Sequence, residues 1–422
     1  MLAQFYPPII GGEENHVRNL SRALVKRGHD VSVATFWHTG MTEYDEDNGL
    51  RIFRIRGTAQ RGSALYLHGE RRHAPPLPDP EAVLALRRLI KQEKPDIVHA
   101  HNWIVHSFVP LKRWSRAGLV MTMHSYEFVC AIHNLIRNGD LCDGPGLSKC
   151  LQCAGQHYGT LKGGVTTIAN NLHSIPQGRA VDMFMPVSRA VAMGTSLDKK
   201  RLPYQIIPNF IADDADIVTD NTFAELDNLP QTPYLLFVGD LSRLKGIEVL
   251  LKAYSTLQQD KAITNLPPLV LIGREVPETP KTLPPNVLLF KSWPHEAVMH
   301  AWKRSLVGIA PSIWADPCPT VVLEAMVMGS PVVASRIGGM VDMVDDGETG
   351  FLFPPGDADA LAAALRRLLI EPGLRQQMGE ASKQKVVAFQ AKTVVPRIEA
   401  VYRQVRPESV SLSASAENKL TL

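Results

Sequence analysis

Short apolar runs alternate with amphipathic helical segments along almost the whole chain, and this alternation limits the fold more than any other feature. The runs are apolar at consecutive positions, as in strands that are buried on both faces of a sheet. Strands separated by helices predict parallel sheets with helices on both sides, an α/β fold. The expected strands are 31–34, 96–101, 119–124, 183–188, 234–239, 269–273, 287–290, 306–311 and 331–335.

The rhythm occurs twice, so the 422 residues are expected to form two domains. The first is 1–208 and the second 209–390, with an acidic, proline-containing linker near 205–221. A last helix, 391–407, is expected to pack back toward the first domain, and the tail 408–422 to be disordered. Doubly wound sheets bind ligands at the carboxyl ends of their strands, so a cleft between the domains is the expected site.

Composition excludes several classes of protein. A net charge of +3 is too small to indicate nucleic acid, and 45% hydrophobic residues are enough for packed cores. No run of 18 apolar residues predicts a spanning helix, and no secretory signal is recognised, so a cytoplasmic protein is expected. Peripheral contact with a membrane is an alternative for the basic residues Arg71, Arg72, Lys112 and Arg113, and a solvated surface is the simpler reading. The oligomeric state is not predicted.

Two glycine-containing turns follow expected strands and open expected helices. Gly11 and Gly12 would let the backbone approach a phosphate or sugar at a helix start, although a tight turn explains them equally well. The segment GDLSRLKG (239–246) places Arg243 and Lys245 at the carboxyl end of a strand. These cations could hold a diphosphate, and the simpler alternative is a solvated loop.

The segment 311–335 is the most informative part of the sequence. Asp316 and Glu324 are eight positions apart and flank the start of an expected helix. Carboxylates that accept two hydrogen bonds suit a vicinal diol, and acids that merely offset the helix dipole are the alternative. The following Gly-rich segment, 335–357, is expected to close over the ligand in the cleft, and ordinary loop turns are the alternative. The backbone N–H groups expected to face a phosphate are those near Cys318, Thr320 and Val321.

Together these segments resemble glycosyltransferase family 4, whose members are retaining enzymes, over about residues 5–405. The resemblance implies the GT-B fold, two doubly wound Rossmann-like domains that face each other across a cleft. It also implies a nucleotide-sugar donor on the second domain and an acceptor on the first. The segments that carry it are 6–31, MTMHS (121–125), FVGDLSRLKG (237–246), DPCPTVVLEAM (316–326), GSPVVAS (329–335) and GGMVDMVDDGETGFLFPPGD (338–357).

The resemblance assigns roles to individual residues. It implies that Asp316 touches the transferred sugar, that Glu324 binds the ribose and that Lys245 neutralises the leaving diphosphate. His124, after its strand, would lie near the sugar and the acceptor, although a strand-end histidine in a polar cleft is the simpler reading. The base is expected near Gly273, Arg274 and the turn 287–293.

The chain also departs from the family pattern. Asp240 stands where the family has arginine, and Arg243 is the expected substitute. Pro319 lacks one backbone donor, and Asp342 replaces a glutamate. The family's first strand is reduced to LAQF, so the strand is short or the start of the sequence lies inside it.

The implied reaction moves a hexose from a nucleotide-diphosphate sugar to a hydroxyl of a sugar, a glycolipid or a small molecule. The preferred donor is a UDP-sugar, and a GDP-sugar is the alternative. The anomeric configuration would be kept by a front-face route, and no cofactor would be needed for catalysis. The competing functions are a sugar-nucleotide epimerase of the same fold and a non-catalytic relative.

A cluster of four cysteines lies within a Gly- and Asp-rich insertion, about 126–160, that we expect to lack helix and strand. Four thiolates that include a C-x2-C pair can hold a structural zinc ion. Free thiols, two disulfides and an iron–sulfur cluster are the alternatives. The insertion follows His124, so it would border the acceptor. The four residues are Cys130, Cys142, Cys150 and Cys153.

Overall fold

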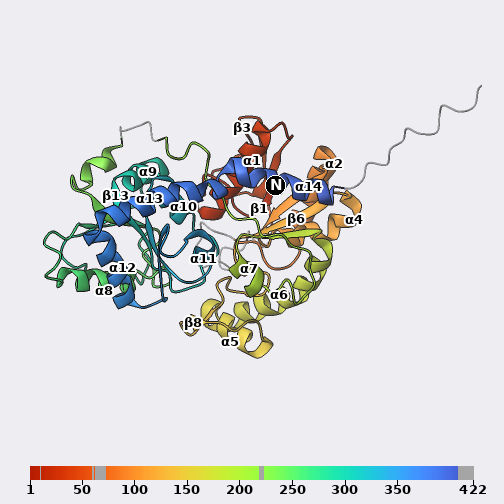
Figure 1. Cartoon of the computed structure of the whole chain (residues 1–422). Helices are drawn as coiled ribbons and strands as arrows, with labels where there is room; N and C mark the ends of the chain where they lie inside the picture. The colour runs from red at the N-terminus through yellow and green to blue at the C-terminus, as the bar shows by residue number, and fades with distance from the viewer. Residues whose placement is uncertain (10, 59–60, 62–72, 218–222, 407–422) are drawn as a thin grey trace, which may run out of the picture.

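Two largely parallel sheets organise the chain, each in its own lobe (Figure 1). The structure is a computed structural model and describes residues 1–9, 11–58, 61, 73–217 and 223–406. The expected tail 408–422 lies outside these residues. Both lobes have helices packed around a central sheet, so the predicted α/β fold of two Rossmann-like domains is confirmed.

The sheet of the N lobe has seven strands in the order β3-β4-β2-β1-β5-β6-β9. All neighbours are parallel except the edge pair β3–β4. The edge strand β3 has the sequence YDED and is largely exposed, so its sequence lacks the apolar run that predicts a buried strand. The strands are β1 (Leu2–Ala3), β2 (Ser32–Phe36), β3 (Tyr44–Asp47), β4 (Leu50–Ile55), β5 (Ile97–His101), β6 (Gly118–Met123) and β9 (Met183–Pro186).

The sheet of the C lobe has six parallel strands in the order β12-β11-β10-β13-β14-β15. Five of its strands lie where the apolar runs predict them, and β15 falls inside the Gly-rich segment, where we expected no strand. The strands are β10 (Tyr234–Val238), β11 (Leu269–Gly273), β12 (Val287–Lys291), β13 (Ser305–Ala310), β14 (Val332–Ser335) and β15 (Gly350–Phe353).

Local chemistry fixes the helix boundaries. In α2, Asp79 accepts a hydrogen bond from the Ala82 N–H, Pro80 occupies the first turn, and Lys94 ends the helix in the left-handed conformation before Pro95. The other helices used below are α1 (Gly12–Lys26), α6 (Thr160–Ala180), α8 (Ile247–Gln258), α9 (His295–Arg304), α10 (Thr320–Val327), α12 (Ala358–Ile370) and α13 (Pro372–Val386). No helix among the described residues is long and apolar enough to cross a membrane.

The last helix, α14 (Ala391–Val405), lies on the N lobe although it follows the C lobe in the sequence (Figure 1). Arg27 of α1 donates two hydrogen bonds to Glu399, at 2.7 and 2.8 Å. Tyr402 and the His99 ring are 2.7 Å apart at Oη and Nδ1. Ile398 packs in the same buried cluster as Leu24 of α1. These contacts tie the end of the chain to the first helix.

The cysteine-containing insertion is folded, so the expectation that it lacks helix and strand is wrong. A small hairpin, β7 (Ile136–Arg137) and β8 (Asp140–Leu141), is followed by α5 (Leu147–Tyr158). The hairpin strands have only two residues each, too short for a periodic pattern to identify. The helix α5 packs against α6, and its Ala154 is buried.

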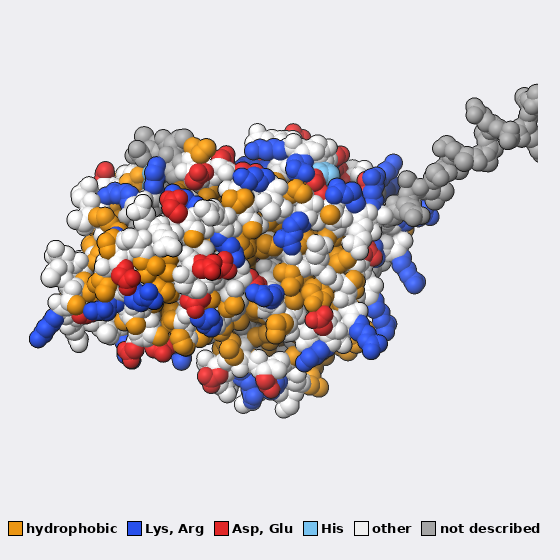
Figure 2. All heavy atoms as spheres, in the orientation of Figure 1, with side chains coloured by type: hydrophobic (Ala, Val, Ile, Leu, Met, Phe, Trp, Pro, Cys, Tyr) orange, Lys and Arg blue, Asp and Glu red, His pale blue; other side chains and the backbone are white. Residues whose placement is uncertain are grey.

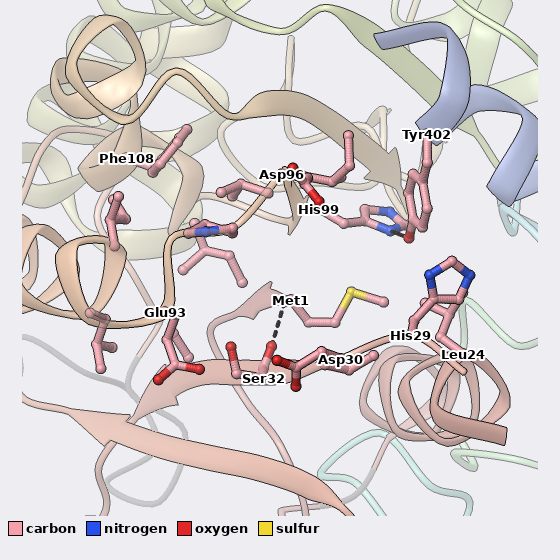
Figure 3. Close-up of a pocket in the computed structure, with 18 of the residues that line it drawn as sticks. Met1, Leu24, His29, Asp30, Ser32, Glu93, Asp96, His99, Phe108 and Tyr402 are labelled. Atoms are coloured by element: carbon pink, nitrogen blue, oxygen red, sulfur yellow. Dashed lines mark hydrogen bonds between the residues drawn. The ribbon is translucent and has the colours of Figure 1, made fainter. Parts of the chain in front are cut away.

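The N-lobe sheet has a gap beside β1, at the edge where its parallel strands begin. Only Leu2 and Ala3 pair with β5, at Ala100 and His101, and Ile97–His99 precede this pairing. A cavity of about 330 Å³ lies here, lined by residues such as Ser32, Glu93 and Phe108 (Figure 3). The Met1 amino group donates to the Ser32 carbonyl at 2.6 Å, and burial lowers its pKa to about 5.

We expect that four strand-forming residues added before Met1, such as Thr-Val-Ile-Val, would stabilise the protein. They would pair with both neighbouring strands and remove a buried amino group. Each kcal/mol gained would raise the Tm by roughly 1 °C for cooperative unfolding of a chain of this length, which thermal denaturation measures. A Gly-Ser-Gly-Ser extension is the control, and an equal Tm for the two extensions would contradict this reading of the cavity.

Candidate functional site

A cavity of about 300 Å³ lies between the two lobes. Its N-lobe wall includes Gly12 and His16 of α1, and its C-lobe wall includes Thr320 and Glu324 of α10. Phe210 of the linker also lines it. The starts of two helices therefore meet at one cavity, and free N–H groups at helix starts favour anions. Neither helix has a side chain that caps its first turn.

Lys245 and Asp316 form an ion pair in the C lobe, with Nζ and Oδ2 2.5 Å apart. Lys245 lies in the turn between β10 and α8. The next residue, Gly246, has φ +77°, and a Cβ there would lie 1.8 Å from the Pro311 carbonyl oxygen. Glycine is therefore required for the turn to approach the end of β13, which brings the ammonium to the carboxylate.

The loop that carries Asp316 is held by the double glycine that follows β14. The Gly339 N–H donates to the Asp316 carbonyl at 2.8 Å. A Cβ at Gly338 would lie 2.4 Å from the Asp316 carbonyl oxygen, and one at Gly339 would lie 2.0 Å from that of Pro317. The Gly-rich segment thus contacts the backbone of the loop 315–318 directly.

Two contacts from the N lobe reach this region. The Tyr126 hydroxyl donates to the Ala315 carbonyl at 2.8 Å. Burial, and secondarily the charge of Asp316, raises the pKa of Tyr126 above its usual value. Asp342 of α11 (Met340–Met343) accepts the Arg189 N–H at 2.8 Å and pairs with its guanidinium. Asp342, a departure from the family pattern, therefore joins the lobes.

Glu324 is held by two side chains of α9 that the sequence did not suggest. Trp302 donates through Nε1 to Oε2 at 3.1 Å, and His295 Nε2 lies 3.2 Å from Oε1. The hydrogen bond to Glu324 raises the pKa of His295. His295 and Trp302 are seven positions apart and so share a helix face. This spacing is the only signal in the sequence that could have linked the two side chains to each other. Both carboxylate oxygens keep further acceptor capacity.

The arginines near the donor side have partners of their own. Arg274 donates to Asp240 through Nε at 3.2 Å and Nη2 at 2.7 Å. A cation from the turn after β11 thus reaches the position where the family has arginine. Arg243 is exposed, and its guanidinium lies against Gly139 in the hairpin turn of the insertion. A Cβ at Gly273 would lie 1.7 Å from the Gly239 carbonyl oxygen, so packing alone requires that glycine.

The remaining donor-side residues differ in orientation. Gly12 faces open space, because a Cβ there would have no atom within 4 Å. Gly11 precedes the helix in extended conformation, and Val321 follows Thr320 in the first turn of α10. Cys318 is buried, with its sulfur 4.0 Å from that of Met343, so only its backbone can serve a ligand. Its carbonyl accepts a hydrogen bond from Asn209 at 3.3 Å.

His124 belongs to a row of four rings, three stacked and the fourth edge-on, which we call the histidine column. Its members are His99 and His101 of β5, His124 after β6, and His16 of α1. Successive ring centroids are 4.4, 5.2 and 4.9 Å apart. His101 Nδ1 lies 3.0 Å from His124 Nε2. The column runs from Tyr402 of α14 to the cavity, and sequence reasoning identified only His124.

The histidine column is buried and therefore disfavours charge. Burial lowers the pKa of His16 to about 4 and those of His99, His101 and His124 well below their usual value. Neither ring nitrogen of His16 has a hydrogen-bond partner among the described residues. The neutral His16 ring lines the cavity, but its two nitrogens are buried and do not face a substrate there.

A buried carboxyl near the insertion was also missed. Glu127 is 3% exposed, and burial raises its pKa to about 8. Its Oε2 lies 3.7 Å from Nδ1 of His133, and His133 packs edge-on against Trp103. These side chains lie at the start of the insertion. In the sequence, Glu127 stands alone between two aromatic residues, so no motif marks it as a buried carboxyl.

The four cysteines lie in separate parts of the insertion but line one small cavity of about 20 Å³. Cys150 and Cys153 are three positions apart on α5, and Cys142 follows the hairpin. All four are free thiols. The Cys142 sulfur donates to the Gly144 carbonyl at 3.4 Å. In the part of the chain that the structure describes, no three metal-binding side chains are arranged to hold an ion, so the zinc site stays a prediction.

Comparisons with known proteins agree with this geometry. The family model "Glycosyltransferase Family 4" matches residues 10–211, and "Glycosyl transferases group 1" matches 218–385. The fold and these matches define a glycosyltransferase enzyme of the GT-B class. The chain is a glycosyltransferase of the family 4 type, since the two models together match both of its domains.

Several relatives align over most of the chain. Glycogen synthase of Mycobacterium tuberculosis is 26% identical over 95% of this chain and 93% of its own. D-inositol 3-phosphate glycosyltransferase of Nocardiopsis dassonvillei is 23% identical over 79% and 76%. Sucrose-phosphate synthase from Thermosynechococcus elongatus has a similar structure, with a TM-score of 0.70 and 22% identity over 96% and 98%. Anabaena Alr3699/HepE in complex with UDP has a TM-score of 0.63 and 14% identity over 96% and 98%.

The histidine column predicts a loss of stability in acid. Each folded-state pKa is depressed, so the native protein binds fewer protons and the free energy of unfolding falls as pH drops below about 6.5. His16→Asn should make this fall shallower by about 1.4 kcal/mol per pH unit between roughly pH 6 and 5. Urea unfolding at several pH values measures it. His173→Asn, outside the column, is the control, and an unchanged slope for His16→Asn would be evidence against the assignment.

The zinc prediction is tested by elemental analysis. About one zinc ion per chain should copurify, because four thiolates can form a closed tetrahedral site. Cys150→Ser and Cys153→Ser should lose the metal and lower the Tm, whereas Cys318→Ser should keep the metal. Absence of stoichiometric metal from protein prepared without chelators would remove the prediction.

Proposed function

We propose that the protein transfers a hexose from a nucleotide-diphosphate sugar to a hydroxyl acceptor with retention of the anomeric configuration. The Lys245–Asp316 pair carries this proposal, because it places a cation and a carboxylate together just before the start of α10. The cation suits a diphosphate, and the carboxylate suits the hydroxyls of a sugar. The helix starts of α1 and α10 line the adjoining cavity and add positive potential for the diphosphate.

UDP is the proposed nucleotide. Anabaena Alr3699/HepE is described in complexes with UDP and UDP-glucose, which supports this choice. Arabidopsis thaliana starch synthase IV, described bound to ADP and acarbose, makes ADP the comparison to include in any test. GDP remains the alternative from the sequence. Glu324, held by Trp302 and His295, would bind the ribose hydroxyls with its remaining lone pairs.

The proposed chemistry proceeds on one face of the sugar. The bond from the anomeric carbon to the diphosphate oxygen breaks while the acceptor oxygen bonds to the same carbon. The acceptor proton passes to the leaving diphosphate, so no separate base is needed. Lys245 and the helix starts would stabilise the charge that develops on the diphosphate. His124, oriented by His101, would position a sugar hydroxyl.

The acceptor is proposed to enter from the N lobe. The cavity wall there is formed by α1, and the histidine column ends at it. The insertion contacts the C lobe, because its Gly139 turn touches Arg243. Sugars, glycolipids and small molecules with a free hydroxyl are the acceptor classes considered. The proposed function therefore fits carbohydrate biosynthesis.

Lys245→Ala should lower kcat by about 10²–10³-fold, the effect of removing one preorganised charge stabiliser. Because the side chain is partly exposed, the fold should survive, and a thermal melt checks this. Lys252→Ala, on the exposed face of α8, is the matched control. Wild-type turnover by Lys245→Ala would contradict the site.

The same assay separates the competing functions. Nucleotide sugars that shift the Tm are first identified, then incubated with and without hydroxyl acceptors, and the products are analysed by NMR. Transfer that requires an acceptor and gives the donor's anomeric configuration supports the proposal. Conversion of donor alone into an epimer would replace it with the epimerase function, and an inverted product would overturn the retaining route.

A further inference from the structure

Helix α6 exposes its large apolar side chains and buries its small and polar ones. Five aliphatic residues spaced four, three, four and three positions apart form one stripe, which we call the α6 stripe. It extends for about 20 Å along the helix at 1.5 Å per residue. Its members and their exposed fractions are Leu161 (84%), Val165 (56%), Ile168 (49%), Leu172 (65%) and Ile175 (59%).

The opposite face of α6 is fixed by specific contacts with the N lobe. Asn170 donates to the Glu127 carbonyl at 3.0 Å, and the Gln177 amide contacts the Met121 sulfur at 2.9 Å. A Cβ at Gly163 would lie 2.3 Å from the Ala154 carbonyl oxygen, so only glycine allows the close packing with α5. The helix therefore cannot rotate its stripe inward without breaking these contacts.

The charged residues near the stripe are mainly basic, although Asp182 follows α6 and Asp198 directly precedes residues 199–201. Residues 144–181, which include α5 and α6, contain no Asp or Glu. Arg179 is exposed at the end of α6. The basic run 199–201 is exposed nearby, since Gly178 contacts Leu202 and Lys200 lies over the Phe128 ring that also approaches Gly178. Figure 2 shows apolar side chains gathered on the lower part of the molecule, near α6 and α7, beside Lys and Arg.

We propose that the α6 stripe docks the N lobe on an anionic membrane surface. Aliphatic side chains would enter the boundary between headgroups and acyl chains, and the cations at the end of α6 would bind anionic headgroups. A second copy of the chain is the other occupant that a heptad-like stripe suits. Charge decides against it, because two α6 faces would bring mainly cations against cations, and the nearby carboxylates of Asp182 and Asp198 already have partners in Lys112 and Tyr204.

This surface differs from the one that the sequence suggested. Arg71 and Arg72 lie outside the described residues, and Lys112 is paired with Asp182. The α6 stripe exposes large aliphatic side chains beside a net positive charge. An anionic bilayer can cover the aliphatic side chains and pair with the cations, whereas water leaves the apolar surface uncovered. The inference rests on this surface and is independent of the proposed donor.

Vesicle cosedimentation tests the proposal with full-length protein. Wild type should bind vesicles of phosphatidylcholine and phosphatidylglycerol at 7:3 much more strongly than phosphatidylcholine alone, and the binding should weaken at high salt. The variant Leu161→Gln/Ile168→Gln/Leu172→Gln should lose at least about tenfold in binding. Arg179→Gln/Lys199→Gln/Lys200→Gln should lose the preference for anionic lipid.

A matched control replaces three exposed aliphatic residues elsewhere, Leu84, Ile370 and Val387, with Gln, and should bind vesicles as wild type does. Thermal melts check the fold, and Leu161→Gln alone repeats the test if the triple variant fails to fold. Lack of vesicle binding by wild type, or equal binding by the stripe variant, overturns the proposal. A wild-type dimer in light scattering that the stripe variant dissociates, without vesicle binding, also overturns it and assigns the stripe to a second copy.

Discussion

The cleft depends on a loop, residues 315–318, whose backbone is held from both lobes. Within the C lobe, Gly339 donates to the Asp316 carbonyl, and from the N lobe Tyr126 donates to that of Ala315. The Lys245–Asp316 pair lies wholly within the C lobe, so it can form before the lobes close. A rotation of the lobes would break the Tyr126 contact and leave the ion pair intact. The proposed donor side is thus preorganised, and the Tyr126 contact with the loop backbone is one of the links between the lobes.

Parallel strands explain why so much chemistry gathers at one face. Side chains two apart on β5 share a side, so His99 and His101 stack, and His124 joins them because β6 is the next strand. Helix α1 adds His16, which lies near the start of this helix beside the cavity. At the other end of the column, Tyr402 of α14 contacts His99. The last helix of the chain therefore contacts one end of the histidine column, and the other end of the column lies at the proposed acceptor side.

Sequence patterns predicted the elements with buried faces and the residues that follow strands. Apolar periodicity located most of the strands, and the spacing of Asp316 and Glu324 marked the helix start correctly. Sequence spacing could not reveal partners from distant segments, such as Trp302 for Glu324 or Arg274 for Asp240, because packing alone brings them together. The hairpin of the insertion escaped notice because its strands are too short to show a period.

The α6 stripe shows why periodicity alone misleads about burial. A stripe of aliphatic residues identifies a helix face, but the contacts of Asn170 and Gln177 decide that this face points outward. The helix α5 supports α6 through Gly163 and through Thr167, whose hydroxyl donates to the Cys150 carbonyl at 3.4 Å. The helix that carries two of the clustered cysteines thus forms the base of the exposed stripe. Any ligand that ties those thiols together would stiffen the stripe's support, because α5 and α6 share this interface.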